Sequence, residues 1–266
     1  MVVEGSLTLD LKTRTTPGAT ATLDSSGTWR LEINAGPKGA YRLAQLDDYS
    51  DVSRAALPWN PPCCFSLQAR SGSAETSPGT WGFGFWNDPF SISLGAGGGG
   101  RRLPALPNTA WFFFASPPNH LSFRDDLPAQ GGLAATFRSP SWPSIALAPA
   151  GLLLPLAVIP ASARLVRGAA RRVIHEDAVQ LSVSQIDWHS YRIDWYEDEA
   201  SFSIDGDIVL RTPVAPYGPL GLVLWIDNQY AALPPDGRLR YGTLENPVGA
   251  WIEIRQITIS PLSKKM

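Results

Sequence analysis

Two short stretches of the chain place aromatic rings directly beside amide and carboxylate groups. The residues concerned are Trp86, Asn87 and Asp88 in the segment 79–90, and Trp225, Asp227, Asn228 and Tyr230 in the segment 225–232. A flat aromatic ring can stack on the C–H face of a sugar while amides and carboxylates bond its hydroxyl groups. These residues are therefore candidates for a carbohydrate site. The alternative is that several of the rings belong to the core, because one face of a half-buried strand must be apolar.

The carboxylates of these stretches also allow an enzyme. Asp88 and Asp227 could act as general acid and base if they face each other within about 10 Å, the upper spacing of an inverting glycosidase pair. The residues that a His-rich metal site, a serine nucleophile or a phosphate-binding loop would require are missing from the sequence. The chain has only three histidines, at positions 120, 175 and 189, so a His-rich metal site is not expected. No Gly-x-Ser-x-Gly nucleophile motif occurs, and the glycine run 97–100 lacks the Lys–Ser/Thr pair of a phosphate loop. No cofactor is predicted.

The composition favours one all-β domain over the 266 residues, 1–266. Charged residues make up only 17% of the chain, and 24 Gly and 24 Pro interrupt it, which is typical of short strands joined by loops. The net charge of −2 and the absence of a basic run beyond Lys264–Lys265 argue against nucleic-acid binding. The adjacent Cys63 and Cys64 are not expected to form a disulfide. The segment 1–12 reads as a strand without a signal-peptide pattern, so a cytoplasmic location is expected.

The elements that would position the candidate residues are strands. Alternating apolar and polar residues predict strands at 5–12, 28–35, 64–71, 108–116, 178–188 and 250–260. The segment 36–62 is expected to be a long loop with one strand around Tyr41–Leu46, and 233–247 is expected to be a loop. The segment 188–230 is the most regular. It reads as three alternating strands with an Asp205–Gly206 hairpin turn, followed by a fourth strand, LGLVLWID (220–227), that is apolar on both faces. We predict that these four strands form one antiparallel meander.

This segment resembles the concanavalin A-like lectin/glucanase superfamily, and within it the laminarinase and lichenase type of glycoside hydrolase family 16. The residues that carry the resemblance are His189, Tyr191, Ile193, Trp195, Phe202, Asp205, Gly206 and Trp225. The resemblance implies an antiparallel β-sandwich, a jelly roll, that binds sugar across a concave sheet, and it implies a structural role for His189. Many members of the superfamily hold a structural calcium ion, for which Glu253 or Asp205 would be the candidate ligand.

In these hydrolases one strand of the concave sheet carries two glutamates and an aspartate on alternating positions. The matching segment here is TAWFFFAS (109–116), and no Asp or Glu lies between Pro107 and Arg124. Phe and Ala can neither attack an anomeric carbon nor transfer a proton. The resemblance thus implies a groove without retaining catalysis, with Trp111 and Phe113 in its apolar floor. It also assigns Arg70, on the strand 64–71, to the bracing of that floor.

An insertion around 144–177 departs from the family pattern. Its apolar part is broken by three prolines and is too short for a membrane span, which needs about 20 apolar residues. From Ser162 onward the sequence predicts a short amphipathic helix. Its expected apolar side is Leu165, Val166, Ala169, Ala170 and Val173, and its expected polar side is Arg164, Arg167, Arg171 and Arg172. The helix could pack on the sandwich edge, cover the groove, or form an oligomer contact. Just before the insertion, Trp142 is a candidate rim aromatic.

Three functions follow from these observations. The first is a carbohydrate-binding protein without the glutamates of family 16. The second is a hydrolase, lyase or cyclase that acts on an apolar or aromatic small molecule in the concave pocket under the insertion. The third is an interaction module whose aromatic residues all belong to the core. The expected partner is a glycan or a small molecule, and the oligomeric state stays open.

Overall fold

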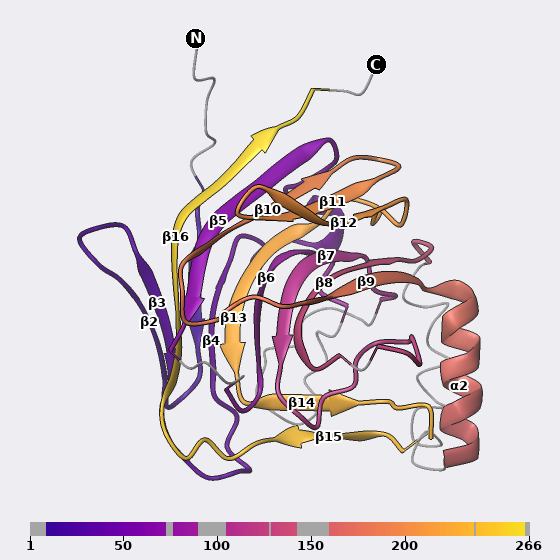
Figure 1. The fold of residues 1–266 in the computed structure, drawn as a ribbon, viewed down its shortest axis with the longest axis horizontal. Coiled ribbons are helices and arrows are strands. Elements are labelled where there is room, and N and C mark those ends of the chain that lie inside the picture. Colours follow the sequence, from indigo (N-terminus) through magenta and orange to yellow (C-terminus); the bar gives the residue numbers. More distant parts are fainter. Residues whose placement is uncertain are drawn as a thin grey trace.

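The computed structural model describes residues 9–72, 77–89, 105–127, 129–142, 160–236 and 238–263. Two antiparallel seven-stranded sheets face each other in this part of the chain (Figure 1). Sheet A runs β1 (Lys12–Thr15), β4 (Leu43–Asp47), β13 (Gly221–Asp227), β6 (Thr80–Trp86), β7 (Thr109–Ala115), β8 (Gly131–Arg138), β9 (His175–Leu181). Sheet B runs β12 (Asp207–Thr212), β11 (Ala200–Ile204), β10 (His189–Trp195), β5 (Cys63–Ser71), β16 (Ala250–Pro261), β3 (Trp29–Ile33), β2 (Ala19–Leu23). The predicted jelly-roll β-sandwich is confirmed.

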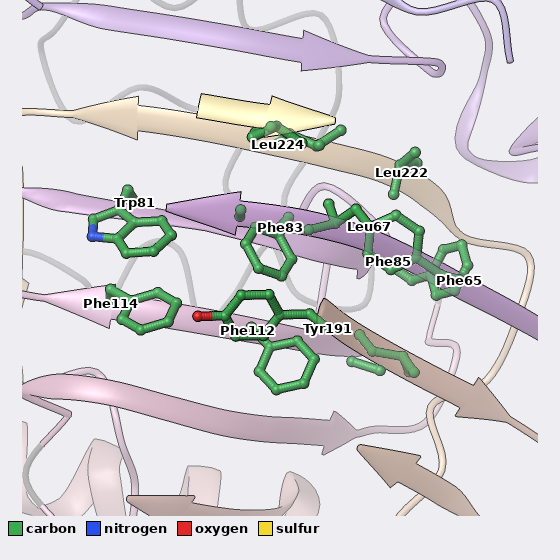
Figure 2. Close-up of a cluster of buried hydrophobic side chains, with 14 of the residues drawn as sticks. Phe65, Leu67, Trp81, Phe83, Phe85, Phe112, Phe114, Tyr191, Leu222 and Leu224 are labelled. Atoms are coloured by element: carbon green, nitrogen blue, oxygen red, sulfur yellow. The ribbon is translucent and has the colours of Figure 1, made fainter. Parts of the chain in front are cut away.

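The core between the sheets is strongly aromatic (Figure 2). Alternate residues of β6 and β7 point from sheet A toward sheet B, as the two-residue period of a strand requires. The rings of Trp81 and Phe114 stack 3.8 Å apart at an interplanar angle of 3°. Tyr191 reaches across from β10 and meets Phe83 and Phe112 edge to face. The alternation in YRIDW thus reflects a strand with one buried face, because Tyr191, Ile193 and Trp195 are all buried.

The predicted four-stranded meander is correct for three strands and wrong for the fourth. β10, β11 and β12 pair in order within sheet B, with the turn at Asp205–Gly206. β13 instead joins sheet A, where it pairs with β4 on one side and β6 on the other. Every residue of β13 is buried, because its inner side chains face sheet B and its outer side chains, Val223 and Trp225, belong to a second cluster of buried residues. An apolar run shows that both faces are covered, but it does not tell which sheet the strand joins.

One loop differs from the expectation. Residues 233–247 contain β15 (Arg240–Thr243), which pairs with β14 (Gln229–Ala232) to form a separate hairpin. In the segment 36–62, the strand expected around Tyr41–Leu46 is present as β4, and a short 3₁₀ turn, Arg54–Ala56, follows it. The first described strand is β1, which begins at Lys12. Of the strand expected at 5–12, residues 5–8 lie outside the described residues and residues 9–11 are not in a strand. The glycine run and the proline-rich half of the insertion, 143–159, lie outside them too.

The predicted helix exists as α2 (Pro160–Val173), but its expected orientation is wrong. Leu165 is 76% exposed and Val166 39% exposed, whereas Arg167 is only 4% exposed. The Arg167 guanidinium donates to the carbonyl oxygens of Ser122, Phe123, Arg124 and Leu233 and to the Asp125 carboxylate. A buried arginine is tolerated where it is bonded in this way, and these acceptors lie on loops that the helix sequence does not reveal. No helix in the described ranges combines the length and the apolarity that a membrane crossing needs.

Candidate functional site

The outer face of sheet A, which points away from sheet B, carries a second aromatic cluster. Its members, which we call the aromatic face, are Trp86, Trp111, Phe113, Phe137 and Trp225. Trp111 lies at its centre. The Trp111 ring centroid is 5.4 Å from Phe113, 5.6 Å from Trp225 and 6.3 Å from both Trp86 and Phe137. These are the distances of interacting aromatic pairs. Four strands, β13, β6, β7 and β8, therefore converge on one indole.

Two glycines of β6 make room for these rings. A Cβ at Gly82 would lie 2.7 Å from the Trp225 ring, and a Cβ at Gly84 would lie 2.7 Å from the Cβ of Trp111. Both glycines stand directly beside those tryptophans in the strand register. The spacing TWGFGFW thus alternates core aromatics with gaps on the outer face. These glycines therefore mark a close approach, and what approaches is the side chain and backbone of neighbouring strands.

Part of this face is covered by α2. Ala170 and Ile174 pack with Leu133, Phe137 and Ala178, which lie on β8 and β9. Within the cluster, Phe113, Phe137 and Trp225 are buried, whereas Trp86 and Trp111 stay partly exposed. The sequence left open whether the helix packs on the sandwich edge, covers the groove or forms an oligomer contact. The structure supports packing on the edge formed by β8 and β9. The accessible aromatic surface is centred on β6 and β7.

A chain of hydrogen bonds joins the aromatic face to a buried carboxyl group. Trp225 Nε1 donates to Thr80 Oγ1 at 2.9 Å, and Thr80 Oγ1 donates to Asp227 Oδ1 at 2.8 Å. Tyr41 donates its hydroxyl to Asp227 Oδ2 at 3.4 Å, and the Gln229 backbone N–H donates to Oδ1 at 3.2 Å. Burial outweighs these hydrogen bonds and raises the pKa of Asp227 to about 7. Asp227 can therefore exchange a proton near neutral pH.

A second polar cluster, on β4, borders the same face. Gln45 pairs with Trp225 in the register, and its Nε2 donates to Asp47 Oδ2 at 2.7 Å and to the Tyr49 hydroxyl at 3.3 Å. Asp47 Oδ1 accepts from the backbone N–H groups of Tyr49 and Ser50. The sequence predicted a strand around Tyr41–Leu46, but these side chains were not among the predicted site residues. The alternation in LAQLD (43–47) is the signal that could have revealed them.

The carboxylates of this face do not form a catalytic pair. Asp227 lies opposite Thr80 at one end of β6, while Asp88 follows Trp86 at the other end. A strand of this length spans about 20 Å, so the expected pairing of Asp88 with Asp227 does not occur. Glu176, on β9, accepts hydrogen bonds from Ser122 Oγ and the Phe123 N–H, both at 2.6 Å, and burial raises its pKa. The outward positions of β7 are Thr109, Trp111, Phe113 and Ala115.

Two of the predicted amides have structural partners. Asn228 is fully buried; its Nδ2 donates to the carbonyls of Ala40 and Leu244, and its Oδ1 accepts from the Arg42 N–H. Asn87 Nδ2 donates to the Leu106 carbonyl at 2.8 Å, and its Oδ1 accepts from the Asn108 N–H at 3.0 Å. Both amides fasten loops at the ends of strands. A sequence pattern cannot separate such an amide from one that faces a ligand, since the partners come from remote segments.

The remaining predicted residues lie away from the aromatic face or at its margin. Arg70 was expected to brace the groove floor, but it points outward from sheet B and pairs with Glu253 at 2.8 Å. The reason is the strand period: Phe65, Leu67 and Ala69 face the core, so Arg70 cannot. Tyr230 is on β14, packed near Gly242 of β15. Trp142 is 49% exposed in the connection after β8.

Within the described ranges, no three or more His, Cys, Asp or Glu side chains are grouped so that they could hold a metal ion. Glu253, one of the two residues considered for calcium, bridges Arg30 and Arg70. The other, Asp205, accepts from the Ser190 N–H at 2.8 Å and lies 2.6 Å from His189 Nδ1.

No family model and no curated protein matches the sequence. Among solved structures, the chain is similar to a β-glucanase of Bacillus licheniformis, with 9% identity, 98% of this chain and 95% of that chain covered, and a TM-score of 0.48. It is similar to a glycoside hydrolase family 16 endo-glucanase from Bacteroides ovatus, with 12% identity, 97% of each chain covered and a TM-score of 0.48. It is also similar to a pseudo β-1,3-glucanase of Mycobacterium tuberculosis, with 9% identity, 92% and 79% covered and a TM-score of 0.47. These proteins are of the glucanase type that the segment 188–230 resembles. At such identities and scores the likeness assigns neither activity nor ligand to this chain.

Proposed function

We propose that this chain binds a carbohydrate on the outer face of sheet A. The observation that carries the proposal is the partly exposed indole of Trp111 at the centre of the aromatic face, with Trp86 beside it. A sugar ring would stack its C–H face on these indoles, and polar groups at the margin, such as the amide of Gln45, would bond its hydroxyls. Because the supporting rings are buried, the two indoles are held in place before a ligand arrives, which reduces the entropy lost on binding.

We further propose that binding is not followed by retaining hydrolysis. That mechanism needs two carboxyl groups about 5 Å apart, one as nucleophile and one as acid/base. The strand that the resemblance matches to the catalytic strand of family 16 is β7, and its outward positions include Trp111 and Phe113. The carboxylates that lie on this face, such as Asp47 and Glu176, are engaged by protein donors. The chain would thus hold a glycan and release it unchanged.

The test is calorimetric titration of the purified chain with β-glucan, xylan and galactan oligosaccharides, together with product analysis after long incubation. Trp111→Ala should weaken binding at least about tenfold, since the lost contact corresponds to about 1.4 kcal/mol or more. Trp142→Ala is the matched control, because this exposed tryptophan is outside the aromatic face and its loss should leave affinity unchanged. Equal affinities for the wild-type chain and Trp111→Ala would exclude this face, and released sugar would exclude the non-hydrolytic role.

A second function is favoured by one observation, the raised pKa of Asp227. An acid that titrates near pH 7 is suited to general acid/base catalysis on an apolar or aromatic small molecule held against Trp111 and Trp225. A panel of such molecules, screened by thermal shift and then by turnover, tests this alternative. A substrate whose turnover is lost in Asp227→Asn, with binding retained, would establish it. Sugar binding that is the same in Asp227→Asn and in the wild-type chain would leave the carbohydrate function in place.

A further inference from the structure

The outer face of sheet B, on the opposite side of the sandwich from the aromatic face, has a cavity of its own. Its volume is 420 Å³, within the range of about 300–1,000 Å³ that small-molecule sites occupy. The side chains that matter here are Gln68, Ser190, Arg192, Ser203, Ile208 and Gln256. They come from five neighbouring strands, β5, β10, β11, β12 and β16. The lining is therefore built by the sheet and not by a loop.

Two interruptions of the strand register shape this cavity. The pairing of β16 with β5 shifts between Arg255 and Thr258, and Gln256 within that shift has a φ of 54°. The pairing of β11 with β12 shifts next to Ser203. A β-bulge bends its strand and redirects a side chain, and bulges are frequent beside functional sites. Here the two bulges lie on opposite sides of the β5–β10 pair and leave a hollow between them.

The polar groups in the hollow are held in fixed orientations. Gln68 Nε2 donates to Ser190 Oγ at 3.2 Å, and Gln68 Oε1 accepts from Arg255 Nε at 2.8 Å. Arg255 is itself stacked on Trp188, with its guanidinium carbon 4.1 Å from the ring centroid. The guanidinium carbon of Arg70 also lies over the Trp188 ring, 5.0 Å from its centroid. The amide of Gln68 is thus locked by a row of stacked side chains.

One hydroxyl group that lines the cavity is available to a ligand. Ser203 lines the hollow, and its hydroxyl makes no side-chain hydrogen bond within the described part of the chain. A hydroxyl in this position offers one donor and two acceptor sites to a ligand.

The charge of the cavity selects the class of ligand. Arg192 is its charged lining residue, and Asp194 neutralises it through two contacts of 3.0 and 2.7 Å. The Arg192–Asp194 pair therefore carries no net charge. The available groups are hydroxyls and amides, with the 54% exposed Ile208 as an apolar contact. We infer that this hollow is a second carbohydrate site, which binds a neutral sugar residue independently of the aromatic face.

The test uses the double variant Gln68→Ala/Ser203→Ala, with Ser201→Ala as the matched control on the same strand outside the cavity. Gluco-, xylo- and galacto-oligosaccharides are titrated into the wild-type chain, into each variant and into Trp111→Ala, after equal melting temperatures have shown that the variants fold. We expect two sites in the wild-type chain, with the second lost in the double variant and kept in Trp111→Ala and Ser201→Ala.

The outcomes separate the two sites. Loss of all binding in Trp111→Ala, with the double variant unaffected, would overturn the outer site and leave the aromatic face in place. Loss in the double variant alone would support the outer site and overturn the proposed function. Absence of binding by every oligosaccharide would overturn both.

Discussion

The indole of Trp225 lies directly over Gly82 on the neighbouring strand, where a Cβ would approach the ring to 2.7 Å and the Phe112 carbonyl oxygen to 2.4 Å. We predict that Gly82→Ala lowers the free energy of unfolding by at least about 2 kcal/mol, because neither the strand backbone nor the packed ring can give way. Urea denaturation measures this. The control is Gly168→Ala on α2, where nothing lies within 4 Å, and the added helix propensity should stabilise by up to about 1 kcal/mol. Equal effects of the two substitutions would contradict the packing described for β6.

The pKa of Asp227 predicts a pH dependence of stability. Its pKa is about 7 in the fold against an ordinary value of 3.8. The folded chain therefore holds this proton more tightly than the unfolded chain does. The contribution to stability is complete below pH 3.8 and is lost as the pH rises to 7, by at most about 1.4 kcal/mol per pH unit.

Asp227→Asn should remove this slope and should be more stable than the wild-type chain above neutral pH. Unfolding free energies measured from about pH 4 to about pH 8 for both chains test it. Asp48, whose pKa burial raises to about 6, is present in both chains and cancels in the difference. Parallel profiles would show that Asp227 ionises freely in the fold.

On α2, replacing the buried Arg167 is predicted to lower stability more than replacing the exposed Leu165. Arg167→Leu should destabilise the chain by about 2–4 kcal/mol, because it leaves the carbonyl groups of Ser122 and Leu233 without their donor. Leu165→Gln should change stability by less than about 0.5 kcal/mol, because that leucine is 76% exposed. Chemical denaturation distinguishes the two. The reverse ranking would mean that the helix packs by the side that its hydrophobic pattern suggests.

Substitution of Asn228 is predicted to lower the stability of the fold without directly weakening sugar binding. Asn228→Ala removes three hydrogen bonds to backbone groups, each worth about 1 kcal/mol, and should lower the free energy of unfolding by about 3 kcal/mol. The neighbouring Gln229→Ala should cost much less, since Gln229 is half-exposed. If Asn228→Ala folded as stably as the wild-type chain and failed to bind sugar, the amide would be a ligand contact instead.

The fold class was predictable because strand period and burial are local. The alternation around Tyr191 and Ile193 defines a half-buried strand. The glycines of β6 are typical of a strand that other side chains and backbone approach closely. What could not be predicted depends on partners far away in the sequence. The buried side of α2 is decided by carbonyl groups on the loops at 122–125 and 233, and the role of Asn228 by the segments at 40 and 244. For the candidate site, the residue types at Trp86 and Trp111 were informative, whereas Arg70 was placed by resemblance and proved to face the other way.

The central position of β13 bears on how this chain is made. β13 completes sheet A between β4 and β6, and β16 completes sheet B between β5 and β3, yet both strands follow their partners by long stretches of sequence. During synthesis, the edges of β4 and β6 that pair with β13 remain without hydrogen-bonding partners until residue 227 has left the ribosome. Contacts so distant in sequence slow folding, and open edges invite pairing between chains. A chain interrupted before β13 would therefore yield two unjoined half-sheets that aggregate, and not a smaller sandwich.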